Sequence, residues 1–197
     1  MRLPSAAAIA LGLVAMLAAN VSLRAEPRQY VIDPAHFSIV FNAMHIGYAP
    51  TWGLFLKGKG GFTFDEETRA LSNLSVEIEA ASVFSNDERR DGHLRSNDFL
   101  AADAHPLITF EMTEARPETE TTGTVTGDLT LRGVMRPVTL DVTLNKIGPY
   151  PFGGTHVVGV SARTTLKRSE FGSTYALEGG LVGDEVEIRI DLEAIRQ

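Results

Sequence analysis

Along most of the chain, hydrophobic and polar residues alternate with a period of two, which is typical of half-buried β-strands. Apolar side chains occupy every second position in four clear stretches, residues 74–80, 108–112, 138–144 and 186–192. We expect four further strands over residues 30–46, 51–65, 122–132 and 155–167. A one-residue slip would carry each apolar set into water, so the alternation also predicts the register of the strands.

The connections between these segments indicate how the strands are arranged. They are short and rich in turn residues, which favours antiparallel neighbours and leaves no room for crossover helices. Several strands exceed the usual strand length, which favours a closed barrel over two stacked sheets. The sequence therefore predicts an all-β fold, an extended eight-stranded antiparallel barrel. Its one irregular part is the charged segment 86–102, which predicts a short helical connection with Ser85 or Asn86 as N-cap.

The alternation also predicts which side chains face the barrel interior. On two strands the inward set consists of Ile39, Phe41, Ala43, Ile108, Phe110 and Met112. The intervening residues Asn42 and Glu111 are expected to face water. A structure with Glu111 buried and Phe110 exposed would contradict this register.

The N-terminus has the features of a signal peptide. Arg2 precedes an apolar run over residues 6–19, and Ala25 offers a small residue at a cleavage point. Residues 1–25 are therefore predicted to be a signal peptide and residues 26–197 a single exported domain, with an uncleaved N-terminal anchor as the alternative. Cleavage removes two arginines and no acid, so the formal charge goes from −7 to −9. Such an acidic domain is unsuited to nucleic acid, whose affinity depends on phosphate neutralisation.

Composition and motifs argue against several kinds of chemistry. The 44% of hydrophobic and 22% of charged residues are typical of a globular domain. The absence of cysteine excludes disulfides, thiolate metal sites and a cysteine nucleophile. Residues 53–60 resemble a P-loop but lack the terminal hydroxyl and the following helix. The five histidines show no metal-ligand spacing, so the sequence predicts no catalytic motif, no metal and no cofactor.

Several runs of residues resemble one protein family. Residues 32–47 are similar to a D-x-x-H-S…F…H-x-G opening, and residues 82–99 to a run containing R-D-x-H-L-x-S-x-D-F. Residues 106–110 and 127–138 are similar to a P-x-I-x-F strand and a G-D-L-T segment, and further matches extend to about residue 194. In this order, the runs resemble the YceI-like family of exported polyisoprenoid-binding proteins. The departures are Phe37, the pair Phe84 and Ser85, and Met135, and Phe84 removes a polar group beside the R-D-x-H-L motif.

The resemblance implies a lipocalin-like barrel whose interior holds a long isoprenoid chain, such as a polyprenyl chain or an isoprenoid quinone. It implies an exported lipid-binding or carrier protein, periplasmic or secreted where there is no outer membrane, with an envelope protein or a second copy left open as partner. An eight-stranded barrel is just wide enough to be filled by side chains or to hold one slender ligand. The expected ligand-binding residues are Ile39, Phe41, His45, Phe62, Phe64, Arg90, His93, Leu94, Phe99, Phe110 and Met112.

The run 90–94 is expected at the mouth of the cavity, with two hypotheses for its role. In one, Arg90 or His93 contacts the polar head of the ligand, and in the other the run ties the connection to the barrel. We expect Asp91 to tie the connection and His93 to face the head, since a neutral imidazole avoids the desolvation cost of a charge. The alternative function is a hydrolase or isomerase of an apolar substrate that uses His45 or His93 as base.

Overall fold

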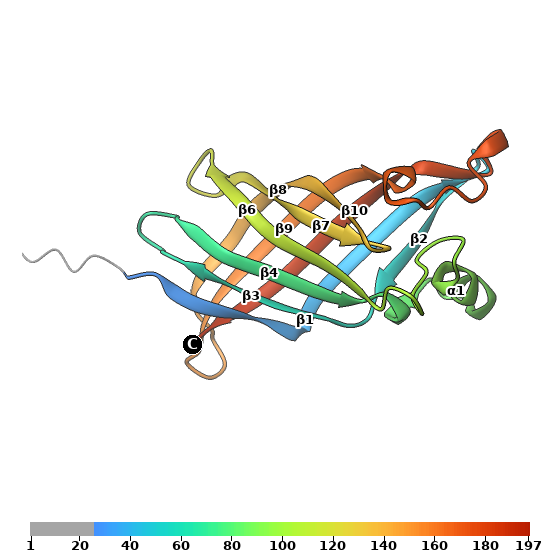
Figure 1. Ribbon diagram of the computed structural model, residues 1–197. Coiled ribbons are helices and arrows are strands. Elements are labelled where there is room, and N and C mark those ends of the chain that lie inside the picture. Colours follow the sequence, from blue (N-terminus) through green and yellow to red (C-terminus); the bar gives the residue numbers. More distant parts are fainter. Residues whose placement is uncertain (1–25) are drawn as a thin grey trace, which may run out of the picture.

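The computed structural model describes residues 26–197, which form one closed sheet with short helical segments at one end (Figure 1). The strands are β1 (Arg28–His45), β2 (Ala49–Phe55), β3 (Gly58–Phe64), β4 (Leu71–Glu79), β5 (Val83–Phe84), β6 (Leu107–Pro117), β7 (Thr122–Leu131), β8 (Val134–Pro149), β9 (His156–Lys167) and β10 (Val182–Arg196). The helical segments are η1 (Ala80–Ser82), α1 (Glu88–Arg95), η2 (Arg168–Phe171) and η3 (Glu178–Gly180).

Pairing of β1 with β10 closes the sheet into a barrel in which all neighbouring strands are antiparallel. β3 and β2 pair with the first and second halves of β1, so together they occupy one strand position. β5 pairs with β2 just as β4 pairs with β3, so β5 continues the position of β4. The segments thus fill eight positions, which confirms the predicted all-β, eight-stranded antiparallel barrel. The expected single strand over residues 51–65 is in fact two strands, and the short β5 was not expected.

The predicted alternation holds along the strands. On β10, the apolar side chains at 186, 188, 190 and 192 face the interior, whereas Glu187 and Arg189 are exposed. Most of these inward side chains are only half-buried, because they border an open cavity rather than one another. The barrel wall is therefore held mainly by its backbone ladders, with less packing across the interior than in a filled core.

The two ends of the barrel differ (Figure 1). One end carries α1 and the segment that contains η2 and η3, and the other carries the β3–β4 and β6–β7 hairpins. The hairpin end is filled by aromatic packing: the Tyr30 ring stacks on Phe62 at 5.4 Å and meets Phe64 edge-on at 6.4 Å. The Tyr30 hydroxyl donates to Glu66 Oε1 at 2.6 Å, and burial together with this hydrogen bond raises the pKa of Tyr30. We call Tyr30, Phe62 and Phe64 the plug.

The charged connection contains one short helix, as expected. α1 begins after Asp87, whose side chain accepts from the Arg90 N–H at 2.8 Å, so the N-cap is Asp87 rather than Ser85 or Asn86. The remainder of residues 86–102 forms turns. Within residues 26–197, no helix has the length and apolar character to cross a membrane. The predicted signal peptide, residues 1–25, lies outside the described residues.

Candidate functional site

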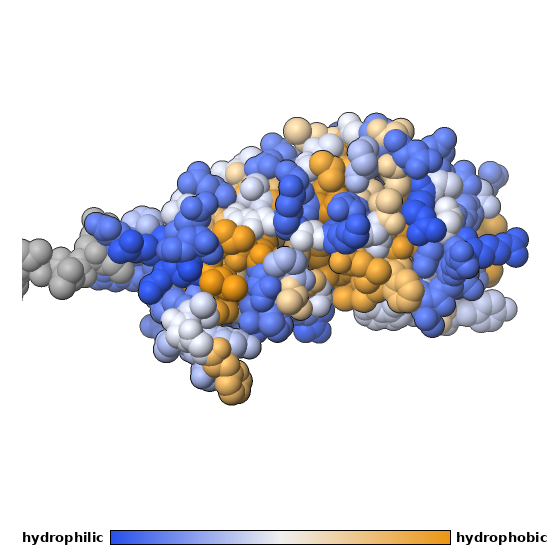
Figure 2. All heavy atoms as spheres, turned by 90° about the horizontal axis from the view of Figure 1, so that it is seen from below, coloured by the Kyte–Doolittle hydropathy of each residue, from blue (hydrophilic) through white to orange (hydrophobic). Residues whose placement is uncertain are grey.

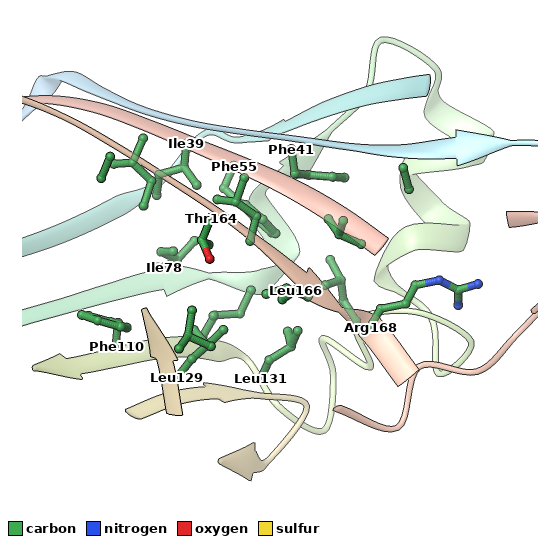
Figure 3. Close-up of a pocket in the computed structure, with 18 of the residues that line it drawn as sticks. Ile39, Phe41, Phe55, Ile78, Phe110, Leu129, Leu131, Thr164, Leu166 and Arg168 are labelled. Carbon is green, nitrogen blue, oxygen red and sulfur yellow. The ribbon is translucent and has the colours of Figure 1, made fainter. Parts of the chain in front are cut away.

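The barrel encloses a cavity of about 910 Å³, within the usual range for ligand pockets. Its wall is formed by apolar side chains from nearly every strand. The close-up shows such side chains converging from different strands, among them Ile39, Phe110 and Leu129 (Figure 3). The opening lies at the end that carries α1, where Met44, Ile46 and Leu181 line the cavity and are exposed. We call this end, bordered by residues 44–46, α1 and residues 168–182, the mouth.

Ten of the eleven ligand-binding residues expected from the sequence line this one cavity. Those toward the plug and along the wall are Ile39, Phe41, Phe62, Phe64 and Phe110. Those at the mouth are His45, Arg90, His93, Leu94 and Phe99. Met112 is the exception, because it is half-buried and lies outside the lining. The register of β6 against β7 shifts between Met112 and Glu114, so the regular alternation ends at this residue. Contact of the ten residues with a ligand stays a prediction.

The predicted register is correct at Phe110 and Glu111 on β6, whereas one exposure predicted on β1 is wrong. Phe110 is buried and Glu111 is exposed, as expected. Asn42 was expected to face water but is 7% exposed. It lies opposite Trp52 on β2 and Glu187 on β10, and its Nδ2 donates to Glu187 Oε2 at 3.0 Å. Both neighbours are larger than asparagine and Glu187 bonds it directly, so Asn42 is removed from solvent although it does not line the cavity.

The phenylalanine rings on the wall lie against glycines of neighbouring strands. A Cβ built on Gly53 would meet the Phe41 ring at 2.5 Å, and one on Gly127 would meet the Phe110 ring at 2.5 Å. A Cβ on Gly58 would meet the Phe37 ring at 2.7 Å. Each missing side chain thus leaves room for a ring to lie along the wall. This explains how bulky residues line the cavity without filling it.

A hydrogen-bonded clasp holds α1 to the barrel at the mouth. Asp91 is 6% exposed, and its Oδ1 accepts from both the N–H and the hydroxyl of Ser85. Arg90 donates from Nε to Ser85 Oγ at 2.8 Å and from Nη2 to the Ser85 carbonyl. Asp91 therefore ties the connection down, as the sequence predicted. The sequence did not identify Ser85 as the partner of Asp91, because its position beside the motif was the only sign of this contact.

Aromatic side chains surround His93 at the mouth. The imidazole lies edge-on to Phe99 at 4.9 Å and to Tyr175 at 5.0 Å, and those two rings are 5.5 Å apart. His93 Nε2 lies 2.8 Å from Asp98 Oδ2. The arrangement fixes the imidazole beside the cavity while leaving it partly exposed, so it can meet a polar group on a bound molecule.

Arg168 is a mouth residue that sequence reasoning did not single out. Its guanidinium donates to the carbonyl oxygens of Ser173, Tyr175, Val182 and Gly183 at 2.8–2.9 Å. It also lies 5.6 Å from the centre of the Phe99 ring, and burial lowers its pKa. In the close-up, the guanidinium points away from the apolar wall (Figure 3). Arg168 therefore organises the backbone of the mouth, and no spacing in the sequence could reveal these carbonyl partners.

The polar groups are confined almost wholly to the mouth. Deeper in the cavity the wall is apolar, with the exception of Thr164, which Figure 3 shows among Ile39, Ile78 and Leu166. Residues 26–197 contain no group of three or more side chains that could hold a metal ion. The outside is mixed, with hydrophobic patches between hydrophilic areas on the face that Figure 2 shows.

Comparisons with known proteins agree with this architecture. The family model described as "YceI-like domain" matches residues 30–194. A UPF0312 protein of Pseudomonas aeruginosa is 39% identical over 193 residues, which cover 97% of each chain. The crystal structure of Burkholderia cenocepacia BcnA superposes with a TM-score of 0.74 at 25% identity, over 82% of this chain and 98% of that one. A polyisoprenoid binding domain from Saccharophagus degradans shares the fold, with a TM-score of 0.62 at 13% identity over 87% and 100% of the two chains.

Proposed function

This chain belongs to the YceI-like family, and we propose that it is an exported carrier that holds a long isoprenoid-type chain inside its barrel. The observation that carries the proposal is the division of the cavity into an apolar tube and a polar mouth. An amphiphile matches this division, with its chain in the tube and its head among the polar groups. The predicted signal peptide supports export, to the periplasm or to the medium where there is no outer membrane.

Burial of the chain supplies the affinity in this proposal. Each methylene that leaves water for the apolar wall contributes roughly 0.8 kcal/mol, so a long chain binds without covalent chemistry. The cavity of about 910 Å³ offers space for many such groups. The fold shared with a protein described as a polyisoprenoid binding domain favours a prenyl chain over other lipids.

The head of the ligand is assigned to the mouth. Arg90 and His93 both line the cavity and are exposed there, so they can donate to an oxygen of a quinone, amide or phosphate. Arg90 already bonds Ser85, and His93 is held by Asp98 and two aromatic rings. Both groups are therefore positioned before any ligand arrives, which lowers the entropic cost of binding.

Native mass spectrometry of the protein purified from the periplasm, followed by lipid extraction, tests the proposal. We expect a co-purifying lipid with a prenyl chain. Ala162 lines the cavity and is 9% exposed, so an Ala162→Trp variant fills part of the tube and should lose the lipid. The control is Ala81→Trp, at an exposed position outside the lining. Repeated absence of any lipid, together with failure to bind added isoprenoids, would overturn the proposal.

A histidine-dependent hydrolase or isomerase is the second candidate, favoured by one observation. His93 Nε2 lies 2.8 Å from Asp98 Oδ2 at the edge of an apolar cavity, and a carboxylate can orient an imidazole for proton transfer. A panel of lipid esterase and isomerase substrates, run on the wild type and on His93→Ala, separates the two functions. Turnover that the variant loses would favour the enzyme, and equal blanks would favour the carrier.

A further inference from the structure

The barrel wall separates between β4 and β6 at the end opposite the mouth. The β4–β6 ladder runs from Glu79 opposite Leu107 to Ser75 opposite Glu111 and ends there. Beyond that point, β4 stays paired with β3 and β6 stays paired with β7, but the two hairpins have no further ladder between them. Figure 1 shows the β3–β4 and β6–β7 hairpins diverging toward their tips. We call the space between the hairpins the seam.

Irregularities in both strands produce this separation. In the β3–β4 pair the register shifts between Gly61 and Thr63, and Asn73 has a φ of 53°. In the β6–β7 pair the register shifts between Met112 and Glu114. Bulges bend the strand that carries them and end pairing, and asparagine tolerates positive φ better than most residues. Both bulges lie within three residues of the last β4–β6 pair, so each hairpin bends just where the ladder stops.

The seam is continuous with the main cavity. A groove of about 100 Å³ lies between the hairpins, with Arg69 on one side and Ala115 and Pro117 on the other. Its inner wall consists of Phe64, Leu71, Val125, Val142 and Leu144, all of which also line the main cavity. Toward solvent its lining becomes polar, with threonines of the β6–β7 hairpin. An apolar path therefore runs sideways from the interior to the surface.

At this end of the barrel, the plug blocks the axis of the cavity and the seam stays open. Tyr30 is fully buried, stacks on Phe62 and is held by its hydrogen bond to Glu66. Glu66 is itself contacted by Arg196 Nη1 at 3.4 Å. A chain that advances along the barrel axis thus meets packed aromatic rings, whereas Phe64 and Leu71 border both the cavity and the groove.

We propose that the seam is a lateral exit that holds the distal units of a prenyl chain too long for the tube. The inference rests on the proposed function, and it adds that the length of the barrel does not limit the length of the chain. Short isoprenoids would lie wholly inside the tube. Longer ones turn at the plug and lie in the groove between the hairpins, where apolar side chains shield the first units that emerge.

Filling the seam tests the proposal. Ala115 is half-buried and lines the groove but not the main cavity, so Ala115→Trp blocks the exit alone. We expect its affinity for undecaprenol to fall at least about tenfold, a loss of about 1.4 kcal/mol, with geranylgeraniol binding unchanged. Ala104→Trp, at an exposed position outside both linings, is the matched control. Unchanged affinity of Ala115→Trp for both ligands overturns the exit. A wild type that binds neither ligand overturns the proposed function and the exit with it.

A second measurement decides the matter if the tryptophan variant does not fold. Because the chain has no cysteine, Ala115→Cys can carry an environment-sensitive thiol dye as the sole label. Undecaprenol should shift the dye emission and geranylgeraniol should not. An equal response to the two ligands, or no response to either while both bind, overturns the exit.

Discussion

Replacement of Gly53 by alanine should narrow the ligand tube while leaving the barrel wall intact. The Cβ of the new residue would lie 2.5, 2.9 and 3.0 Å from three carbon atoms of the Phe41 ring. Its three nearest neighbours all belong to that ring and none to the backbone, so the ring has to move rather than the strand. Phe55 already lies on one side of Phe41, with 5.4 Å between ring centres. The ring therefore turns into the cavity.

The magnitude follows from the space that the ring takes from the ligand. If the displaced ring excludes about two methylenes of a prenyl chain, the loss is about 1.6 kcal/mol, or somewhat more than tenfold in affinity. Stability of the empty protein should change little, because alanine is favoured over glycine in a strand by about 0.5–1 kcal/mol and this offsets part of the rotamer strain.

Calorimetric titration with geranylgeraniol gives the affinity, and two further variants act as controls. A Cβ on Gly159 would meet nothing closer than 3.9 Å, so Gly159→Ala should bind like the wild type. Replacing the ring by a smaller side chain in Gly53→Ala/Phe41→Leu should restore part of the lost affinity. A double-mutant cycle that includes Phe41→Leu measures this recovery. If Gly53→Ala binds normally, or if the double variant recovers nothing, the role assigned to the glycine is wrong.

Three further predictions concern the wall, the clasp and the plug. Thr164→Val should tighten binding of a pure hydrocarbon chain by up to about 1–3 kcal/mol, because the chain covers the threonine hydroxyl and offers it no hydrogen-bond partner. Weaker binding would contradict this. Asp91→Ala should lower the free energy of unfolding by about 1–3 kcal/mol, since it leaves two buried donors of Ser85 without a partner, and an unchanged urea midpoint would refute the clasp. Burial alone would raise the pKa of Glu66, but Tyr30, His156 and Arg196 hold that pKa below its usual value. This carboxylate therefore stabilises the fold above the unfolded pKa of about 4.3, and the stabilisation is lost as the pH falls through the lower folded-state pKa. Glu66→Gln should flatten that acid-side slope in unfolding titrations, and an unchanged slope would contradict the assignment.

The alternation of side chains made the barrel predictable, because burial of one face leaves a strand little choice of register. Phe110 and Glu111 show this directly, since their exposures match their parity. Parity could not predict that Asn42 would be covered, because that depends on Trp52 and Glu187 of neighbouring strands. Nor could it place Met112, because the alternation gives no sign of the bulge that begins there.

At the mouth, the sequence motif located the clasp but not its partners. Asp91 and Arg90 meet at Ser85, five or six residues away along the chain, and this is a contact that a turn has to create. Arg168 binds backbone carbonyls, which every residue carries, so no side-chain pattern could indicate them. The spacing of residues along the chain thus predicts the position of such a site better than it predicts the hydrogen-bond partners of its side chains.

Three features of this barrel prevent its apolar tube from collapsing in water. The pairing of β1 with β10 leaves no free edge at the point of closure, so narrowing the tube would break ladder hydrogen bonds around the ring. Phe37, Phe41 and Phe110 lie against glycines, where they gain contact with the wall instead of with one another across the tube. The plug packs the far end and spaces the strands there. Such a wall keeps the inward side chains half-buried. A ligand in the cavity would cover them. Binding should therefore raise the melting temperature in proportion to the logarithm of ligand concentration once the ligand exceeds its Kd. At equal concentration, the rise should be larger for ligands that reach the plug than for those confined to the mouth.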